Sequence, residues 1–354
     1  MLDSLYEKAL EKKDELNYRL EQDFKNINID PYEFWVNEDI NEEELDITIS
    51  GGDGSRYSKE FMSFALYAVG AECLVYNSNG LESVECCDID ILRPYSYVKN
   101  RLDNYMRILE VKTNLKSLQL YDIDLILFDG SILGDIIRPS PLENMLPDIS
   151  REMIQSKYLE KLEDSLKSQN VQIMSPKLFN LIETDFKKRK LEAMIYLESL
   201  ENLVSLKSFL EKTNNIAAIS KTSARSDYFG SYIPDMAIFD SFNKKQGYTK
   251  PKHFKISEIG NRKFPIYDEF FKELTFTIFY ARLDNFKNVI KVELPYKADE
   301  EEIRRVLGKI KCVCADGYPH LLKKAHHDVI VKRTDLEMIT RIMGFLEKTG
   351  REML

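Results

Sequence analysis

Two copies of the tripeptide Asp-Gly-Ser, at residues 53–55 and 129–131, constrain the fold of this chain more than any other feature. Each copy follows a segment with the composition of a β-strand. Residues 45–50 alternate between apolar and polar side chains, and residues 124–128 are mostly apolar. In open α/β sheets, residues at the carboxyl ends of strands line the binding site. We therefore expect both aspartates to lie at one edge of a single sheet.

The hydrophobic period along the chain alternates between that of strands and that of helices, which predicts an α/β fold. Between residues 142 and 212, apolar residues recur at three- and four-residue spacing, so this stretch is predicted to be a helical insertion. The order of the elements favours a mixed sheet flanked by helices. Further strands are predicted at residues 61–68, 72–77, 216–220, 276–282 and 289–294, and helices at residues 4–25, 97–118, 299–311, 321–331 and 334–348.

Charge and cysteine content restrict the class of protein only broadly. The 59 acidic and 50 basic residues give a net charge of −9, which argues against a protein that simply coats nucleic acid. The negative net charge is still compatible with an enzyme that acts on nucleic acid, because carboxylate-bound cations can neutralise phosphate locally. The five cysteines form no disulfide frame or standard zinc site, and no apolar run approaches the roughly 20 residues that span a bilayer. We therefore expect a cytoplasmic protein with reduced thiols and no membrane anchor.

Two carboxylates delivered by neighbouring strands can hold hard divalent cations through oxygen. A pair of such ions about 3.5–4 Å apart would activate a water molecule and stabilise the leaving oxygen of a phosphodiester. Asp-Gly-Ser is also good turn chemistry, so either copy alone can be explained as a turn. Both Asp53 and Asp129 follow apolar segments, and this coincidence favours a shared site.

Six short motifs resemble those of the NurA-family nucleases, in the same order, and they span residues 46–330. Each motif is weak alone, but their order and the secondary structure expected around them agree with the family. The motifs are Asp53-Gly54-Ser55-Arg56, a helix with Glu110, Asp129-Gly130-Ser131-Ile132, a strand before Lys221, Tyr280-Ala281-Arg282 followed by Val292-Glu293-Leu294-Pro295, and Gly317-Tyr318-Pro319 followed by Ala325-His326.

This resemblance implies a ribonuclease H-like fold, with a mixed sheet flanked by helices and a long helical insertion. It also implies a site for Mn²⁺ or Mg²⁺, with two ions held by three carboxylates and a histidine. His327 competes with His326 for the histidine position, because the two are adjacent. The implied metal ligands are Asp53, Glu110, Asp129 and His326, and Lys221 and Tyr318 complete the catalytic set.

Basic residues close to the motifs are candidates for contact with DNA phosphates. Arg56, Lys221 and Arg282 are the first choices. The basic run at residues 187–190 is explained either as a solvated helix face or as a stripe that contacts phosphates. Three aromatic residues in the loop after Lys221 would either stack on an unpaired base or pack against one another: Tyr228, Phe229 and Tyr232.

The resemblance implies a metal-dependent DNA nuclease, a 5′-to-3′ exonuclease with single-strand endonuclease activity, that resects DNA ends in double-strand-break repair. It further implies a homodimer that works with a hexameric DNA translocase of the HerA type. The sequence contains no Walker A motif, so ATP-driven movement would have to come from such a partner. Two alternatives stay open: an actin-like or sugar-kinase-like phosphotransferase, which grips nucleotide phosphates with paired Asp-Gly loops, and a non-catalytic adaptor that binds DNA or an ATPase.

The implied domain organisation is simple. Residues 1–30 would form an N-terminal helix, and residues 31–354 the nuclease domain. The ribonuclease H-like core would comprise about residues 45–140 and 215–330, with the insertion at residues 142–212 and a C-terminal helix at residues 334–350.

Overall fold

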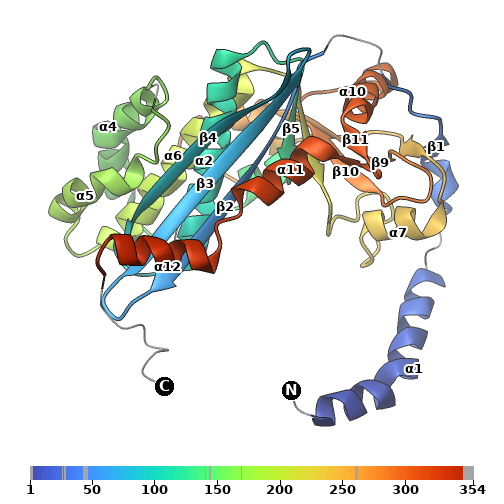
Figure 1. The fold of residues 1–354 in the computed structure, drawn as a ribbon, viewed down its shortest axis with the longest axis horizontal. Helices are drawn as coiled ribbons and strands as arrows, with labels where there is room; N and C mark the ends of the chain where they lie inside the picture. Colours follow the sequence, from blue (N-terminus) through green and yellow to red (C-terminus); the bar gives the residue numbers. More distant parts are fainter. Residues whose placement is uncertain are drawn as a thin grey trace.

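The computed structural model describes residues 3–25, 27, 29–42, 47–139, 141–142, 145–168, 170–259 and 262–345. Within these residues, ten strands form one mixed sheet. Helices cover both faces of this sheet (Figure 1), which confirms the predicted mixed α/β architecture. β2 pairs in parallel with β5, and β5 in parallel with β6, whereas the other paired strands are antiparallel. The order is β1 (Trp35–Asn37), β7 (Gly247–Thr249), β9 (Thr275–Arg282), β10 (Ile290–Leu294), β6 (Ile216–Ser220), β5 (Leu125–Asp129), β2 (Ile49–Glu60), β3 (Ala65–Asn77) and β4 (Gly80–Leu92), and β8 (Lys252–Lys255) pairs with β9.

One face of the sheet is covered by α2 (Val98–Leu120), and α6 (Lys190–Lys212) packs on α2. Buried ion pairs join the two helices: Arg101 to Glu198, and Lys112 to Glu201, each with a nitrogen–oxygen distance of 2.6 Å. Two further helices, α4 (Asp148–Ser165) and α5 (Phe179–Asp185), lie against α6 (Figure 1). The described part of residues 142–212 is thus mostly helical, and its helices form a packed layer against α2.

The opposite face is covered by two amphipathic helices, α10 (Glu300–Cys312) and α11 (His320–Val329). Alternate residues of β5 face the two layers, so Leu125 and Leu127 pack with α10 and α11 while Ile126 and Phe128 pack with α2 and α6. The remaining elements are α1 (Asp3–Lys25), α3 (Ile132–Ile137), α7 (Asp235–Phe242), α8 (Ile256–Ile259), α9 (Asp268–Glu273), α12 (Arg333–Ile342), the short strands β11 (Cys314–Ala315) and β12 (Tyr318–Pro319), and the 3₁₀ turns η1 (Pro31–Glu33) and η2 (Ser175–Leu178).

The second part of the sheet differs from the sequence prediction. Residues 61–68 and 72–77 were expected as two strands, but β3 is one strand that is paired along its length with both β2 and β4. β4 was not predicted, because its acidic residues at positions 82, 85, 88 and 90 hide the strand pattern. β4 is an edge strand, and charged side chains on such a strand discourage pairing with other chains.

The first Asp-Gly-Ser copy does not end a strand but lies inside β2, so the prediction for Asp53 is wrong on this point. Helices press on β2 from both sides. A Cβ atom at Gly51 would lie 2.9 Å from a side chain of α11, and one at Gly54 would lie 2.8 Å from a side chain of α2. Glycine therefore allows both helices to approach the strand on either side of Asp53. Asp129, the last residue of β5, does end a strand as predicted.

The ends of the chain agree in part with the predicted helices. α1 and α12 are present, and α1 points away from the rest of the fold (Figure 1). Leu45 and Asp46 of the first predicted strand, and residues 346–350 of the predicted C-terminal helix, lie outside the described residues. Among the helices that are described, none has the length and apolar character needed to cross a membrane.

Candidate metal centre

Asp53 and Asp129 lie side by side because their strands are parallel neighbours. Gly52 of β2 is paired with Phe128 of β5, so the aspartate that follows each of them stands at the same level of the sheet. Asp53 is buried, and Asp129 is half-buried at the end of β5. Gly130 then turns the chain with a φ of +114°, which glycine adopts without a steric penalty. The two carboxylates therefore meet where β5 ends.

His326 brings a third candidate ligand from α11. The apolar side of this helix packs on β2, which directs the histidine toward Asp53. Nδ1 of His326 lies 2.5 Å from Oδ2 of Asp53, and one ligand atom each of Asp53, Asp129 and His326 lie within 4.8 Å of one another. The His326 side chain remains 58% exposed. His327 is also exposed but is not part of this cluster, so the geometry favours His326.

Glu110 approaches from α2, and the missing side chain of Gly54 leaves room for Met106, one turn before Glu110 on the same helix. Glu110 is only 4% exposed, and its Oε1 atom has no hydrogen-bond partner. Burial raises the pKa of Glu110 well above its ordinary value, and the charges of Asp53, Asp135 and Asp129 raise it further. Glu110 is not among the atoms that lie within 4.8 Å of one another, but it belongs to the same acidic centre.

The electrostatics of the centre favour a bound divalent cation. Burial raises the pKa of Asp53 and the Asp129 carboxylate raises it further, while hydrogen bonds from His326 and from the backbone N–H of Gly54 oppose the shift. Carboxylates held this close repel one another when both are ionised. Mn²⁺ and Mg²⁺ are hard cations that prefer carboxylate oxygen. The donor set, with the unsatisfied Oε1 atom of Glu110, fits such an ion.

Lys221 and Tyr318 flank the Asp129 carboxylate. Lys221 directly follows β6, and its Nζ lies 2.9 Å from Oδ2 of Asp129 and 4.9 Å from the centre of the Tyr318 ring. Burial, followed by the charges of Asp129 and Asp53, raises the pKa of the Tyr318 hydroxyl. The Lys221 side chain is 45% exposed, so its ammonium group stands at the surface of the centre. The structure thus gathers around one point all six residues that the family resemblance implied as catalytic.

The turn after Asp129 is fixed by Glu293, to which the sequence analysis gave no role. Glu293 is fully buried in β10, and its Oε1 accepts hydrogen bonds from Ser131 Oγ and Lys291 Nζ, both at 2.6 Å. Its Oε2 accepts a hydrogen bond from the backbone N–H of Leu133 at 3.2 Å. Ser131 and Leu133 belong to the start of α3, so Glu293 holds the segment that follows Asp129. Two charged residues within a short apolar strand were the signal in the sequence.

The arginines selected for phosphate contact have different surroundings. Arg56 is partly exposed, and its guanidinium group binds Asp103 of α2 through Nε at 2.6 Å and Nη2 at 2.5 Å. Arg282 is fully buried and contacts Asp240, with Nη2 3.3 Å from Oδ1. Arg282 therefore has a place inside the fold and does not reach the surface of the centre. We correct the interpretation of Arg282 as a residue that contacts DNA.

The other candidate residues do not join the centre. Tyr228 and Phe229 are buried, so they pack in the core and are not available to stack on a base, whereas Tyr232 is exposed and donates a hydrogen bond to Asp23 of α1. In the basic run, Lys190 forms an ion pair with Glu183 of α5, which agrees with a solvated helix face.

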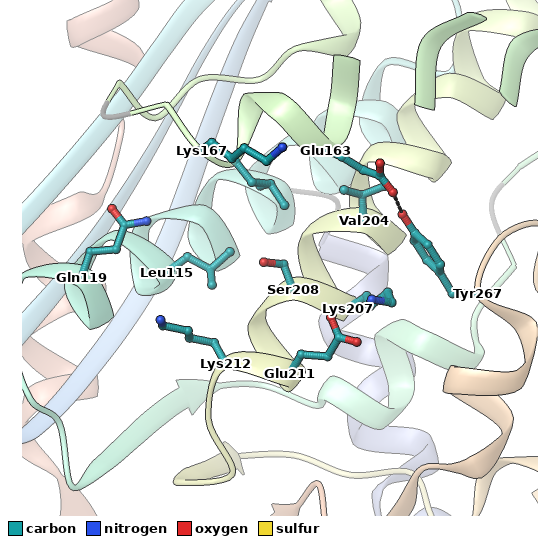
Figure 2. Close-up of a pocket in the computed structure, with 11 residues that line it drawn as sticks. Leu115, Gln119, Glu163, Lys167, Val204, Lys207, Ser208, Glu211, Lys212 and Tyr267 are labelled. Carbon is teal, nitrogen blue, oxygen red and sulfur yellow. Dashed lines mark hydrogen bonds and ion pairs between the residues drawn. The ribbon is translucent and has the colours of Figure 1, made fainter. Parts of the chain in front are cut away.

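A separate groove lies between α2, α4 and α6 and has a volume of about 370 Å³. Figure 2 shows lysine and glutamate side chains around it, with the Tyr267 hydroxyl bound to Glu163. Lys207 in the groove is already paired with Glu211 at 2.6 Å. None of the predicted site residues lines this groove, so it has no part in the metal centre.

Comparison with known proteins decides the family. Residues 47–331 match the profile of the NurA domain, which covers the whole sheet from β2 onward. This chain belongs to the NurA family. The match includes each of the six residues around the centre.

Named relatives and solved structures agree with this assignment. The chain is 28% identical to the probable DNA double-strand break repair nuclease NurA of Methanocaldococcus jannaschii, over 91% of this chain and 84% of that protein. It is 27% identical to the DNA double-strand break repair nuclease NurA of Saccharolobus solfataricus, over 97% and 96%. The crystal structure of the NurA nuclease from Sulfolobus solfataricus has a TM-score of 0.75 with 26% identity over 97% of both chains. A crystal structure of NurA bound to dAMP and manganese shares the fold, with a TM-score of 0.69 and 18% identity over 98% of both chains.

Proposed function

We propose that this NurA-family protein is a metal-dependent DNA nuclease that hydrolyses phosphodiester bonds at DNA ends during double-strand-break repair. The observation that carries the proposal is the convergence of Asp53, Asp129 and His326 within 4.8 Å, beside the buried Glu110 and the exposed Lys221. The names of the relatives and a structure of a family member with dAMP and manganese support a DNA substrate and a divalent ion. By family resemblance, we propose 5′-to-3′ exonuclease activity with single-strand endonuclease activity.

In this proposal the acidic centre holds two Mn²⁺ or Mg²⁺ ions, with Asp53, Glu110, Asp129 and His326 as ligands. Such ions, when bound, lower the pKa of a water molecule and neutralise charge on the phosphate. As the alternative to binding an ion, His326, whose Nδ1 faces Asp53 and whose side chain is 58% exposed, can accept or donate a proton at Nε2. The Lys221 ammonium group, which lies 2.9 Å from Asp129 Oδ2, would stabilise the negative charge that develops on the phosphate oxygens. Tyr318 supports Lys221 through its ring.

We further propose that the strands around the centre form a ribonuclease H-like core. The supporting observation is the order β4-β3-β2-β5-β6, in which three antiparallel strands adjoin two strands that are parallel to β2. The core would place Asp53 on the first of these strands and Asp129 on the fourth in chain order.

The remaining parts of the proposal concern assembly. By family resemblance, we propose a homodimer that receives DNA from a hexameric translocase of the HerA type. The sequence lacks a Walker A motif, so ATP-driven movement of the DNA would come from that partner. The actin-like phosphotransferase and the non-catalytic adaptor are not retained. The chain belongs to a nuclease family, and all the implied acidic residues are present at one centre.

A nuclease assay tests the function directly. Linear DNA labelled at the 5′ or the 3′ end is incubated with the purified protein, with Mn²⁺ or with EDTA, and the products are resolved on a sequencing gel. We expect cleavage only with the metal ion, and the label that is released first reports the polarity. Asp53→Asn and Asp129→Asn should each lower the rate by more than about a hundredfold, because even residues that only support a metal ligand account for 10- to 100-fold effects. Full activity of both variants would rule out the proposed centre.

A further inference from the structure

A row of charged residues on α2 leads away from the metal centre. Asp103, Arg107 and Glu110 are spaced so that they share one side of the helix, with Arg107 one turn before Glu110. Nε of Arg107 lies 3.0 Å from Oδ1 of Asp135, on α3, and the Arg107 side chain is 24% exposed. An arginine that reaches solvent therefore lies next to the most deeply buried carboxylate of the centre.

Arg107 and Asp135 share the electrostatic environment of the centre. The positive charge of Arg107 opposes the rise in the pKa of Glu110, whereas the charge of Asp135 adds to it. Burial raises the pKa of Asp135 to about 6, although Arg107 and Arg138 act in the opposite direction. The ionised form of Asp135 therefore depends in part on its ion pair with Arg107, at 3.0 Å, and the Arg107 side chain is exposed enough to reach a second anion.

The positions of the cations suggest where a DNA strand lies. Lys221 reaches the centre from β6, at the end of the sheet strands, and Arg107 reaches it from α2. Both side chains are partly exposed. A phosphate group held at the centre would have two cations near it, Lys221 beside Asp129 and Arg107 one helical turn from Glu110. An arginine also offers several N–H donors in one plane, which match phosphate oxygens better than a single ammonium group does.

We propose that Arg107 binds a phosphate of the DNA strand next to the one that is cleaved, and that Asp135 holds the guanidinium group in place until DNA displaces it. This inference rests on the proposed nuclease function, since it assumes a DNA strand at the metal centre. It assigns Arg107 to substrate binding and Asp135 to positioning.

DNA binding without cleavage tests the inference. The affinity of a fluorescent single-stranded oligonucleotide is measured by anisotropy in Ca²⁺, at several salt concentrations, for the wild-type protein and for Arg107→Ala, Arg107→Lys and Asp135→Asn. Arg304→Ala is the matched control, because Arg304 is also paired with a carboxylate, Glu38, but lies on α10. Thermal unfolding of each variant, and Mn²⁺-dependent cleavage by the wild-type protein, are recorded alongside.

We expect Arg107→Ala to weaken binding by about tenfold or more, and to reduce the slope of log affinity against log salt by roughly one. Arg107→Lys should recover part of the affinity. Asp135→Asn should leave binding unchanged or make it tighter, because the guanidinium group is released. If Arg107→Ala binds like the wild type, or if Asp135→Asn weakens binding as much as Arg107→Ala with an unchanged slope, the pair is structural and the inference is wrong. A wild-type protein that binds DNA but does not cleave it would instead count against the nuclease function.

Discussion

At the scale of single residues, Glu110 shows how burial and neighbouring charges affect a carboxylate of the acidic centre. Its carboxylate is buried, has an oxygen without a hydrogen-bond partner, and faces Asp53, Asp129 and Asp135. Its pKa in the folded protein is raised, so the folded state binds a proton more tightly than the unfolded state does. The contribution of Glu110 to stability is therefore greatest below its ordinary pKa of about 4.3, and it is lost as the pH rises through the folded value.

This reasoning predicts the behaviour of Glu110→Gln. In EDTA at pH 7.5 the variant should unfold at a temperature a few degrees higher than the wild type, since each kcal/mol corresponds to roughly 2–4 °C. At pH 4 the two proteins should unfold at similar temperatures. Mn²⁺ should raise the unfolding temperature of the wild type at pH 7.5 and have little effect on the variant. Differential scanning calorimetry at both pH values checks this, and a variant that is less stable than the wild type in EDTA at pH 7.5 would contradict it.

The residues of the centre differ in how well the sequence predicts them. Asp53, Asp129 and His326 come from short motifs, and the fold brings them together. Arg107 and Glu293 were assigned no role, because their roles depend on partners far away in sequence, such as Ser131 for Glu293. Arg282 was misassigned for a related reason. An arginine beside a motif can point into the core instead of toward the site, and the sequence does not show which. Arg282 points into the core, where it forms an ion pair with Asp240.

At the scale of elements, the position of α2 determines where Glu110 points. The ion pairs Arg101–Glu198 and Lys112–Glu201 fix α2 against α6, and Glu201 also accepts hydrogen bonds from the backbone N–H groups of Met174 and Ser175. Both pairs are almost completely buried. Removal of one member of a buried pair leaves the other as an unpaired charge, which is strongly destabilising.

Glu201→Ala is therefore expected to lower the free energy of unfolding by about 3–5 kcal/mol. Glu211→Ala is the matched control, because Glu211 is a partly exposed member of a pair with Lys207 on the same helix, and it should cost about 1 kcal/mol or less. Urea unfolding at pH 7.5 measures both. If both variants lowered the free energy of unfolding by the same amount, the buried Lys112–Glu201 pair would not be what holds α2 against α6.

The sequence predicts most elements but fails where the strand pattern is masked. Helices with a clear apolar side, such as α10 and α11, and short buried strands such as β5 and β6 were expected close to their observed bounds. The acidic residues on the outer side of β4 hide its strand pattern, and the glycines around Asp53 are typical of a turn, so the sequence predicts that β2 ends there. In the fold, Gly51 and Gly54 make room for α11 and α2. The local sequence does not reveal this role, because it depends on helices that are distant along the chain.

At the scale of the whole molecule, α1 is set apart from the other elements. It contains no buried residue, and several of its large apolar side chains are exposed, including those of Leu5, Leu10 and Leu20. Its described side-chain contact with the rest of the fold is the hydrogen bond between Asp23 and Tyr232. Deletion of residues 1–25 should thus change the unfolding free energy of the monomer by no more than about 1 kcal/mol, since one exposed hydrogen bond contributes about that much. Urea unfolding of the shortened chain at low concentration tests this, and a loss of several kcal/mol would mean that α1 packs on the fold in solution.

The order of strands in the sheet could not be predicted from the sequence, because parallel pairing of β2 with β5 joins residues such as Ile49 and Leu125, which are 76 positions apart, and leaves no local signal. It is this pairing that sets Asp53 beside Asp129. The acidic overall charge is compatible with a DNA substrate, because divalent cations held by carboxylates can neutralise phosphate locally and the ammonium group of Lys221 stands beside these carboxylates.

The most direct test of the account is a crystal structure of the protein soaked in manganese, with anomalous data collected at the manganese absorption edge. We predict an anomalous peak within bonding distance of Asp53, Asp129 and His326, with Glu110 turned toward the same site, and no such peak in crystals of Asp129→Asn. An active enzyme whose manganese is bound elsewhere, with these four side chains free of metal, would contradict the central claim that they form the catalytic metal centre.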